Sequence, residues 1–174
     1  MEKEALKRIF EFLEDNEGHK TPFLWKHINN IPLIEKDLNI EGNLDLSNSD
    51  ITSLPKGLQV GGDLNLFDSK ITSLPEGLKV GGDLYLNNSL ITSIPKGLKV
   101  GRDLDISFSH IESLPRGLKV GGDLYLNDSD LHRNIDYNDS SELESIVKKM
   151  VEPGFIKGNV IFDEEGEDWF KSHI

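Results

Sequence analysis

Residues 61–80 read GGDLNLFDSKITSLPEGLKV, and nearly the same 20 residues occur four times in succession. The four copies begin at Glu41, Gly61, Gly81 and Gly101, and a fifth copy, GGDLYLNDSDL, begins at Gly121 and then loses the pattern. A fixed period of this length predicts a solenoid, in which each unit buries its apolar face by stacking on the next unit. The positions of every unit are numbered here from 1 to 20, with Gly61 as position 1 of its unit.

The apolar positions of the unit predict how each coil is built. Positions 4 and 6 are Leu or Ile in every copy, and this alternation with polar residues predicts a short strand with one buried face. Positions 11, 14, 18 and 20 are also Ile, Leu or Val in every complete copy, which predicts a continuous core. Pro at position 15 and Gly at position 17 predict an extended segment or a single 3₁₀ turn on the return side. Ser at position 9 is expected to bond the backbone of the adjacent coil.

The segments that flank the repeats are expected to cover the open ends of the solenoid. Helical spacing of apolar residues predicts a helix over residues 3–15, and Thr21-Pro22 predicts the start of a second, short one. A capping box at Ser141–Glu144 predicts a helix that Pro153-Gly154 ends. Residues 155–162, FIKGNVIF, follow the pattern of LKVGGDLYL and predict one further coil. We therefore expect one structural domain with an N-terminal helical cap (1–40), the repeats (41–130), and a helical insertion, last strand and cap (131–174).

Composition and charge restrict the class of partner. Acidic residues outnumber basic residues 31 to 19, which gives a formal net charge of −12. Because phosphate binding needs a basic footprint, this balance argues against direct contact with nucleic acid and favours a protein partner with a basic surface. The chain has no cysteine, which excludes disulfides and thiolate metal sites. No signal-peptide core and no apolar stretch of membrane-spanning length is present, so we expect a cytoplasmic protein that does not contact a membrane.

The frame L-x-L-x-x-S-x-I-x-x-L-P, from Asn43 to Leu126, resembles the short bacterial-type leucine-rich repeat. It is also similar to leucine-rich repeats predicted in bacteriophage and bacterial genomes, where GLxVGGDLxL units recur. The resemblance implies an α/β solenoid, a right-handed coil with a parallel β-sheet on its concave face, here with helical caps at both ends. Three departures keep a parallel β-helix open as the alternative fold: Gly at position 1, Ser in place of Asn at position 9, and G-L-x-V after the proline.

The candidate binding residues flank the buried Leu pair of each strand, where an alternating strand directs side chains outward. Position 3 carries a column of aspartates, and positions 5, 7 and 8 carry further acidic residues and aromatic rings. The predicted site consists of Asp63, Asp83, Asp103, Asp123, Asp45, Asp105, Tyr85, Tyr125, Phe67 and Phe108. Stacked carboxylates repel one another, so the column indicates a surface for a basic partner, with the aromatic residues as anchors. The alternative is that repeat duplication spread an aspartate that bonds a turn amide.

Other kinds of site have weaker support. A Ca²⁺ ladder on the aspartate column has the wrong period for calcium-binding solenoids. The five histidines are dispersed, although His110 and His132 could approach one another, and no nucleophile, phosphate loop or metal-ligand spacing is present. We therefore expect no enzymatic activity, no cofactor and no metal. The basic residues at positions 16 and 19 indicate a solvated edge, with an anion site as the alternative.

These observations predict a non-catalytic protein–protein interaction module that is a monomer when free. Together with the resemblance, they indicate a phage inhibitor of a host nucleic-acid-binding or immune protein, acting in the host-cell cytoplasm. Two alternatives stay open: a structural, self-associating or virion-associated repeat protein, and a bacterial effector acting on eukaryotic host proteins.

Overall fold

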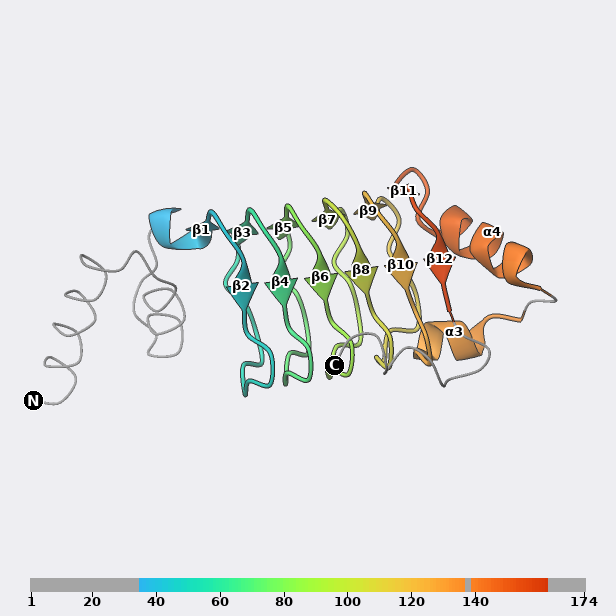
Figure 1. Ribbon diagram of the computed structural model, residues 1–174, viewed down its shortest axis with the longest axis horizontal. Helices are drawn as coiled ribbons and strands as arrows, with labels where there is room; N and C mark the ends of the chain where they lie inside the picture. Colours follow the sequence, from blue (N-terminus) through green and yellow to red (C-terminus); the bar gives the residue numbers. More distant parts are fainter. Residues whose placement is uncertain (1–34, 137–138, 163–174) are drawn as a thin grey trace, which may run out of the picture.

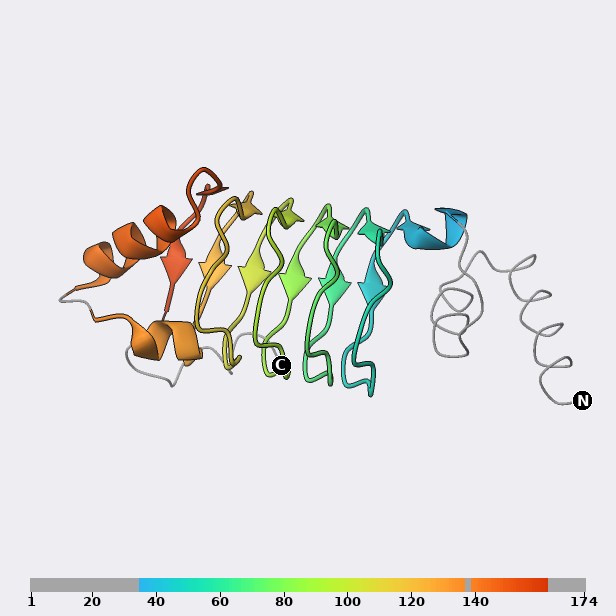
Figure 2. The same cartoon turned by 180° about the vertical axis from the view of Figure 1, so that it is seen from behind.

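The repeats form a solenoid with two parallel β-sheets that meet at a corner of each coil and border one core (Figure 1). The computed structural model describes residues 35–136 and 139–162, so the helices predicted over residues 3–15 and from Thr21 lie outside the described residues. The described chain begins with a 3₁₀ helix, η1 (Glu35–Leu38). Successive coils then stack in a row along the long axis of the molecule (Figure 2). The predicted solenoid with in-register parallel strands is confirmed.

Each coil contributes one two-residue strand to each sheet. Sheet A contains positions 19 and 20, in the order β1 (Asn39–Ile40), β3 (Gln59–Val60), β5 (Lys79–Val80), β7 (Lys99–Val100), β9 (Lys119–Val120) and β11 (Phe155–Ile156). Sheet B contains positions 4 and 5, in the order β12 (Val160–Ile161), β10 (Leu124–Tyr125), β8 (Leu104–Asp105), β6 (Leu84–Tyr85), β4 (Leu64–Asn65) and β2 (Leu44–Asp45). Sheet B is the predicted strand face. Sheet A lies on the return side, where we expected only an extended or turn conformation.

The second sheet moves the fold toward the alternative of a parallel β-helix. The residues between the two sheets on the return side form turns around Pro and Gly, and the described repeats contain no helix there. Backbone pairing in sheet A arises because positions 18 and 20 both point inward, which holds the segment between them extended and in register with its neighbours. The periodic Leu-x-Val of each unit was the sequence signal for this sheet.

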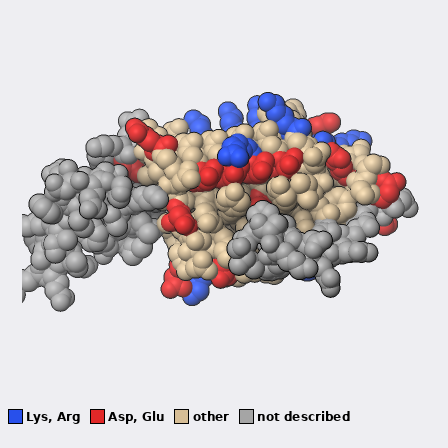
Figure 3. Space-filling view, viewed as in Figure 1, with Lys and Arg blue, Asp and Glu red and all other residues tan. Residues whose placement is uncertain are grey.

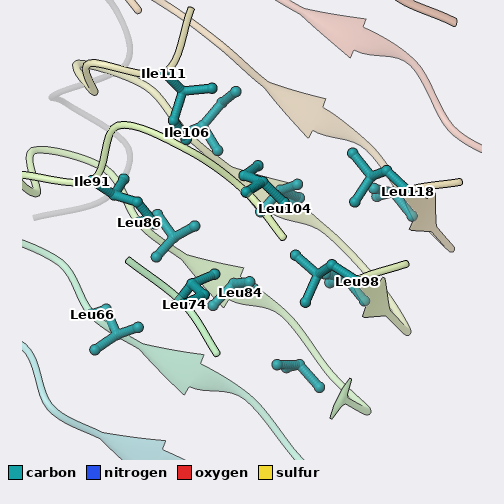
Figure 4. Packing of buried hydrophobic residues seen from close by; sticks show 14 of the residues in the cluster. Leu66, Leu74, Leu84, Leu86, Ile91, Leu98, Leu104, Ile106, Ile111 and Leu118 are labelled. Atoms are coloured by element: carbon teal, nitrogen blue, oxygen red, sulfur yellow. The ribbon is translucent and has the colours of Figure 1, made fainter. Parts of the chain in front are cut away.

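All predicted inward positions of the complete repeats are buried, and they form one continuous core between the sheets (Figure 4). Each ladder repeats one residue type from coil to coil, apart from Ile106 and Ile94 in two leucine ladders. At position 4, Leu64, Leu84 and Leu104 have no exposed surface. The serines at position 9 serve this core differently from the prediction. Ser69 Oγ donates to the carbonyl of Leu66 in the same coil at 2.7 Å, rather than to the adjacent coil. The hydroxyl thus closes the turn that follows each sheet-B strand.

The C-terminal part adds two helices and a last coil. Ser129 caps the short helix α3 (Asp130–Asn134), and Asp139 caps α4 (Ser140–Met150) by accepting from the amides of Ser141 and Glu142. The predicted helix is therefore confirmed, with its cap two residues before the expected one. It buries Leu143 and Val147 in the core cluster, so α4 covers the C-terminal end of the solenoid. The further coil predicted from residues 155–162 is also confirmed, since β11 pairs with β9 and β12 with β10.

In the middle coils, glycine at position 1 allows the close approach of successive coils, whereas Glu41 and Lys157 occupy this position in the first and last coils. A Cβ on Gly101 would collide with the backbone carbonyl of Gly81, and the same contact recurs at Gly81 and Gly121. Sheet A ends at this point and the chain turns toward sheet B, so a collision with backbone is relieved only if two coils move apart.

We expect Gly101→Ala to destabilise the protein by about 1–3 kcal/mol, because the added methyl group meets backbone rather than a flexible side chain. Gly42→Ala is the matched control, since a Cβ at Gly42 has no neighbour within 4 Å. Chemical denaturation of both variants measures the difference. Equal stability of the two variants would contradict the close-approach explanation.

Candidate acidic binding face

The aspartate column arises from a reversal of hydrogen-bond direction at the corner between the two sheets. In sheet A, amides donate to the preceding coil, as from Gly81 to the Val60 carbonyl at 2.8 Å. In sheet B, they donate to the following coil, as from Leu64 to the Asp83 carbonyl at 2.8 Å. Between the two sheets, the amide at position 3 of each coil points toward the preceding coil. The position-3 carbonyl of that preceding coil points in the opposite direction, so it cannot accept from this amide. One amide in each coil therefore lacks a backbone acceptor.

The side chain at position 3 supplies the missing acceptor. Oδ1 of Asp63 accepts from the Asp83 amide, Oδ1 of Asp83 from the Asp103 amide, and Oδ1 of Asp103 from the Asp123 amide, each at 2.9 Å. The ladder continues to the Asn159 amide at 2.7 Å. The alternative interpretation of the column, an aspartate that bonds a turn amide, therefore describes a contact that the structure contains. Position 3 has a structural role in every coil.

This structural role does not need a negative charge. In the first coil the same place is occupied by Asn43, whose Oδ1 accepts from the Asp63 amide at 2.9 Å. The geometry matches that of the aspartates, and the neutral amide fills it. The four carboxylates of the next coils thus carry a charge that the ladder does not use.

Acidic side chains form a line across one face of the molecule (Figure 3). The second oxygen of Asp63 accepts from Asn43 Nδ2 at 3.2 Å, a neutral partner. Asp63, Asp103 and Asp123 are half-buried and partly open to solvent, whereas Asp83 is only 6% exposed. Asp83 differs because the Tyr85 hydroxyl donates to its Oδ2 at 3.2 Å and Arg102 Nε lies 3.5 Å from its Oδ1. The expectation that all four aspartates are exposed is therefore wrong for Asp83.

Arg102 is a member of this face that the sequence interpretation missed. Arg102 is the one residue at position 2 that is not glycine. This interruption of the repeat was the signal in the sequence that could have identified Arg102 as part of the face. Within the described residues, it makes the only ion pair between a basic side chain and the four aspartates at position 3. The remainder of the column is not neutralised by a described side chain.

Position 5 combines turn-closing groups with tyrosines. Asp45, Asn65 and Asp105 each accept the amide two residues later, at 3.0, 3.0 and 2.9 Å, which closes the turn after the strand. Tyr85 and Tyr125 stand on either side of Asp105 in register. Asp105 is 5% exposed, so its predicted place on the open surface is also wrong. The exposed acidic face therefore consists of Asp45, Asp63, Asp103 and Asp123.

The negative charge of this face is visible in the tyrosine ionisation. Burial, followed by the charge and hydrogen bond of Asp83 and the charges of Asp63 and Asp103, raises the pKa of Tyr85 to about 12. Burial and the charges of Asp103 and Asp123 also raise the pKa of Tyr125. Both phenols thus remain neutral hydrogen-bond donors on a surface where a second anion is disfavoured.

The two phenylalanines occupy different environments. Phe67, at position 7, is 36% exposed and lies in the turn after β4, where its amide donates to Asn65 Oδ1. Phe108, at position 8, is half-buried and has a φ of 54°. Position 8 is left-handed in all five units, and the other four carry Asn or Asp, which tolerate this conformation better than a bulky side chain. The backbone of Phe108 is therefore strained, because a bulky side chain disfavours the left-handed conformation.

Next to this face lie three polar side chains that are buried at position 7 of successive coils: Asn87, Ser107 and Asn127. The side-chain oxygens of all three lack a hydrogen-bond partner. Sequence reasoning placed Asn87 and Asn127 on the surface, and their burial corrects that expectation.

The described residues offer no other candidate chemistry. His110 Nδ1 contacts Asp130 Oδ2 at 3.2 Å, and the His132 ring packs against Phe162 with centroids 5.2 Å apart, so the two histidines have separate partners. Within residues 35–136 and 139–162, no three His, Asp or Glu side chains are placed to hold a metal ion. Neither helix there has the length and apolar character needed to span a bilayer.

Comparison of the chain with protein-family models, curated proteins and solved structures found no match. The resemblance to leucine-rich repeats therefore stays a prediction, and the function must be argued from the geometry of the face.

Two substitutions at Asp103 separate the ladder from its charge. Asp103→Ala removes the acceptor of the Asp123 amide and should cost about 1–3 kcal/mol, since a partly buried N–H loses its partner. Asp103→Asn keeps an oxygen in the position that Asn43 uses, and should change the free energy of unfolding by less than about 0.5 kcal/mol. Denaturant titration of both variants tests this, and a large loss in the Asn variant would show that the ladder needs a carboxylate.

The Tyr85 phenol should titrate with a pKa near 12, and Asp83→Asn should lower that pKa by removing both a charge and a strong acceptor. Since the folded pKa lies above the ordinary value, the contribution of Tyr85 to stability is intact below pH 10 and lost as the pH rises through about 12. Phenolate absorbance measures the titration, with Tyr85→Phe to identify the signal. An unchanged titration in Asp83→Asn would exclude the aspartate as a cause.

Proposed function

We propose that this protein is a non-catalytic binding module whose acidic face on sheet B holds a partner protein with a basic surface. The observation that carries the proposal is Asn43, which makes the ladder bond of position 3 without a charge. Asp63, Asp103 and Asp123 make the same bond and keep an anionic oxygen that has no described basic partner. Their charge exceeds what the fold requires.

Retaining that charge has an energetic cost in the free protein. In-register strands place the carboxylates about 4.8 Å apart, and each adjacent like-charge pair costs a few tenths of a kcal/mol in solvent. Asparagine would remove this cost and keep the ladder. A basic partner offsets the repulsion on binding, which is the reason for a row of carboxylates to persist on a surface.

The aromatic residues of the face fit the same role. Tyr85 and Tyr125 are half-buried among the aspartates and present hydroxyl groups that remain protonated at physiological pH. Exposed Phe67 and strained Phe108 add apolar surface beside them. Large, rigid aromatic side chains next to charges are typical of the residues that dominate binding energy in protein interfaces. Backbone strain at Phe108 is tolerated where a side chain has a use other than stability.

The chemistry of the face also defines the partner. A row of carboxylates repels nucleic acid, and its complement is a row of Lys and Arg such as a nucleic-acid-binding groove presents. On this proposal the protein inhibits such a partner by occupying its groove. The resemblance to phage and bacterial repeats extends the proposal to a phage inhibitor of a host nucleic-acid-binding or immune protein.

End-to-end assembly is disfavoured by the C-terminal helix. Leu143 and Val147 of α4 have no exposed surface and close the core at that end, so a further coil cannot add there. A structural role through open solenoid ends therefore lacks support at the described C-terminal end.

The test compares two variants that each remove three negative charges. Asp63→Asn/Asp103→Asn/Asp123→Asn neutralises the face and keeps the ladder, whereas Glu76→Gln/Glu112→Gln/Glu152→Gln neutralises exposed carboxylates elsewhere. Binding of a labelled oligolysine peptide is measured by fluorescence anisotropy at low and physiological salt. We expect roughly tenfold weaker binding for the Asn variant, near wild-type binding for the Gln variant, and weakening with salt.

The proposal fails if both variants weaken binding equally, since net charge would then explain the effect. It also fails if wild-type affinity does not change with salt. A natural partner captured from bacterial lysate by wild type and not by the Asn variant identifies the physiological target.

A further inference from the structure

The lysines of sheet A form a second charged surface, separate from the acidic face. Lys79, Lys99 and Lys119 occupy position 19 of successive coils and are paired in register. The neighbouring Val at position 20 points into the core, so the lysine side chains point outward. Figure 3 shows basic side chains gathered along the edge of the molecule, above the line of acidic ones. A strongly acidic protein thus concentrates positive charge on one edge.

These lysines have no acidic partner among the described residues. The ion pairs there join Asp50 to Lys70, Asp83 to Arg102 and Glu144 to Lys148. Arg133 pairs with Asp128 and Asp130, and His110 pairs with Asp130. None involves Lys79, Lys99, Lys119 or Lys157. The backbones of three lysines are therefore stacked at strand spacing, about 4.8 Å, and their ammonium groups have no described countercharge. As on the acidic face, like charges remain in a row that the fold does not require, since Gln59 occupies the same register.

The row borders a shallow groove that runs along the corner of the coils. Its lining consists of positions 19, 20 and 1 of successive coils, from Asn39 to Lys157. The backbone of this floor is already paired, as in the bond from Gly101 to the Val80 carbonyl at 2.9 Å. A ligand in the groove therefore finds side-chain ammonium groups rather than free backbone groups. This excludes addition of a strand and favours pairing of charges.

An aromatic residue ends the groove. In the last coil Phe155 takes the register of Lys119, is 43% exposed, and has the Lys119 Nζ 5.8 Å from its ring centroid. Lys157 follows two residues later and also lines the groove. The site thus combines a row of cations with an exposed apolar ring at one end.

We propose that this groove binds an extended acidic segment of a partner protein. Its carboxylates pair with Lys79, Lys99 and Lys119, and an apolar side chain of the segment contacts Phe155. A narrow segment fits because the aspartates of position 3 follow immediately beyond the glycine corner. A nucleic acid carries charge along its whole backbone and would extend over those aspartates, where it is repelled. This inference is independent of the proposed function of sheet B, and a protein with both surfaces would bridge a basic and an acidic partner.

The experiment uses the full chain and a fluorescein-labelled oligoglutamate peptide that ends in phenylalanine. The row from Lys79 to Phe155 covers three strand spacings, about 14 Å, which about five extended residues span. The test variant is Lys79→Gln/Lys99→Gln/Lys119→Gln. The matched control is Lys56→Gln/Lys96→Gln/Arg116→Gln, which removes three exposed positive charges from position 16. Thermal unfolding establishes that both variants are folded, and anisotropy measures peptide binding at low salt.

We expect binding to weaken roughly tenfold in the position-19 variant and to stay within about twofold of wild type in the control. Phe155→Ala should weaken binding of this peptide and leave binding of oligoglutamate without phenylalanine unchanged. Equal effects of the two lysine variants, or no binding to wild type, overturn the proposal. Tighter binding of a single-stranded oligonucleotide through the same lysines also overturns it and assigns nucleic acid to the groove.

Discussion

In each coil, one backbone amide has no backbone carbonyl to donate to, and this constraint determines much of the structure. Hydrogen bonds run toward the preceding coil in sheet A and toward the following coil in sheet B, so the direction must reverse at the corner between them. At the reversal, a side-chain oxygen at position 3 takes the place of a backbone carbonyl. The requirement restricts position 3 to Asp or Asn. The tight stacking of the middle coils accounts for their glycine at position 1, whereas Glu41 and Lys157 occupy this position in the first and last coils. The aspartates of the acidic face thus have a structural role first, as acceptors for this backbone amide.

Exceptions within the repeat show which side chains the fold requires and which it only tolerates. Asn43 shows that the ladder works without charge, and Gln59 shows that the outward row of sheet A does not need lysine. Arg102 shows that position 2 accepts a side chain in one coil. These exceptions within a near-identical repeat act as internal controls, because the backbone environment is constant while the side chain changes. They are the firmest basis for a functional interpretation when family models, curated proteins and solved structures give no match.

The period and its apolar positions were enough to predict the solenoid, the parallel register, the core and the last coil, because each depends on which side chains point inward. Two-residue strands in sheet A were not predicted, because the Leu-x-Val alternation that marks them covers only three residues and follows a turn-forming Pro and Gly. Sequence also could not choose between a functional and a bonded aspartate, because both occur at the same period. Burial of Asp83 and Asp105 depends on Tyr85, Tyr125 and Arg102, which interrupt the repeat, so periodicity carried no information about it.

The in-register stacking has a consequence for how such a protein can change over time. A duplication of 20 residues inserts one complete coil and leaves every existing contact type intact. Each insertion lengthens both sheets by the same step and adds one residue to the position-3 column and one to the position-19 row. The length of the solenoid therefore changes in fixed steps of one coil, which allows both of its charged surfaces to be matched to the length of a partner's surface.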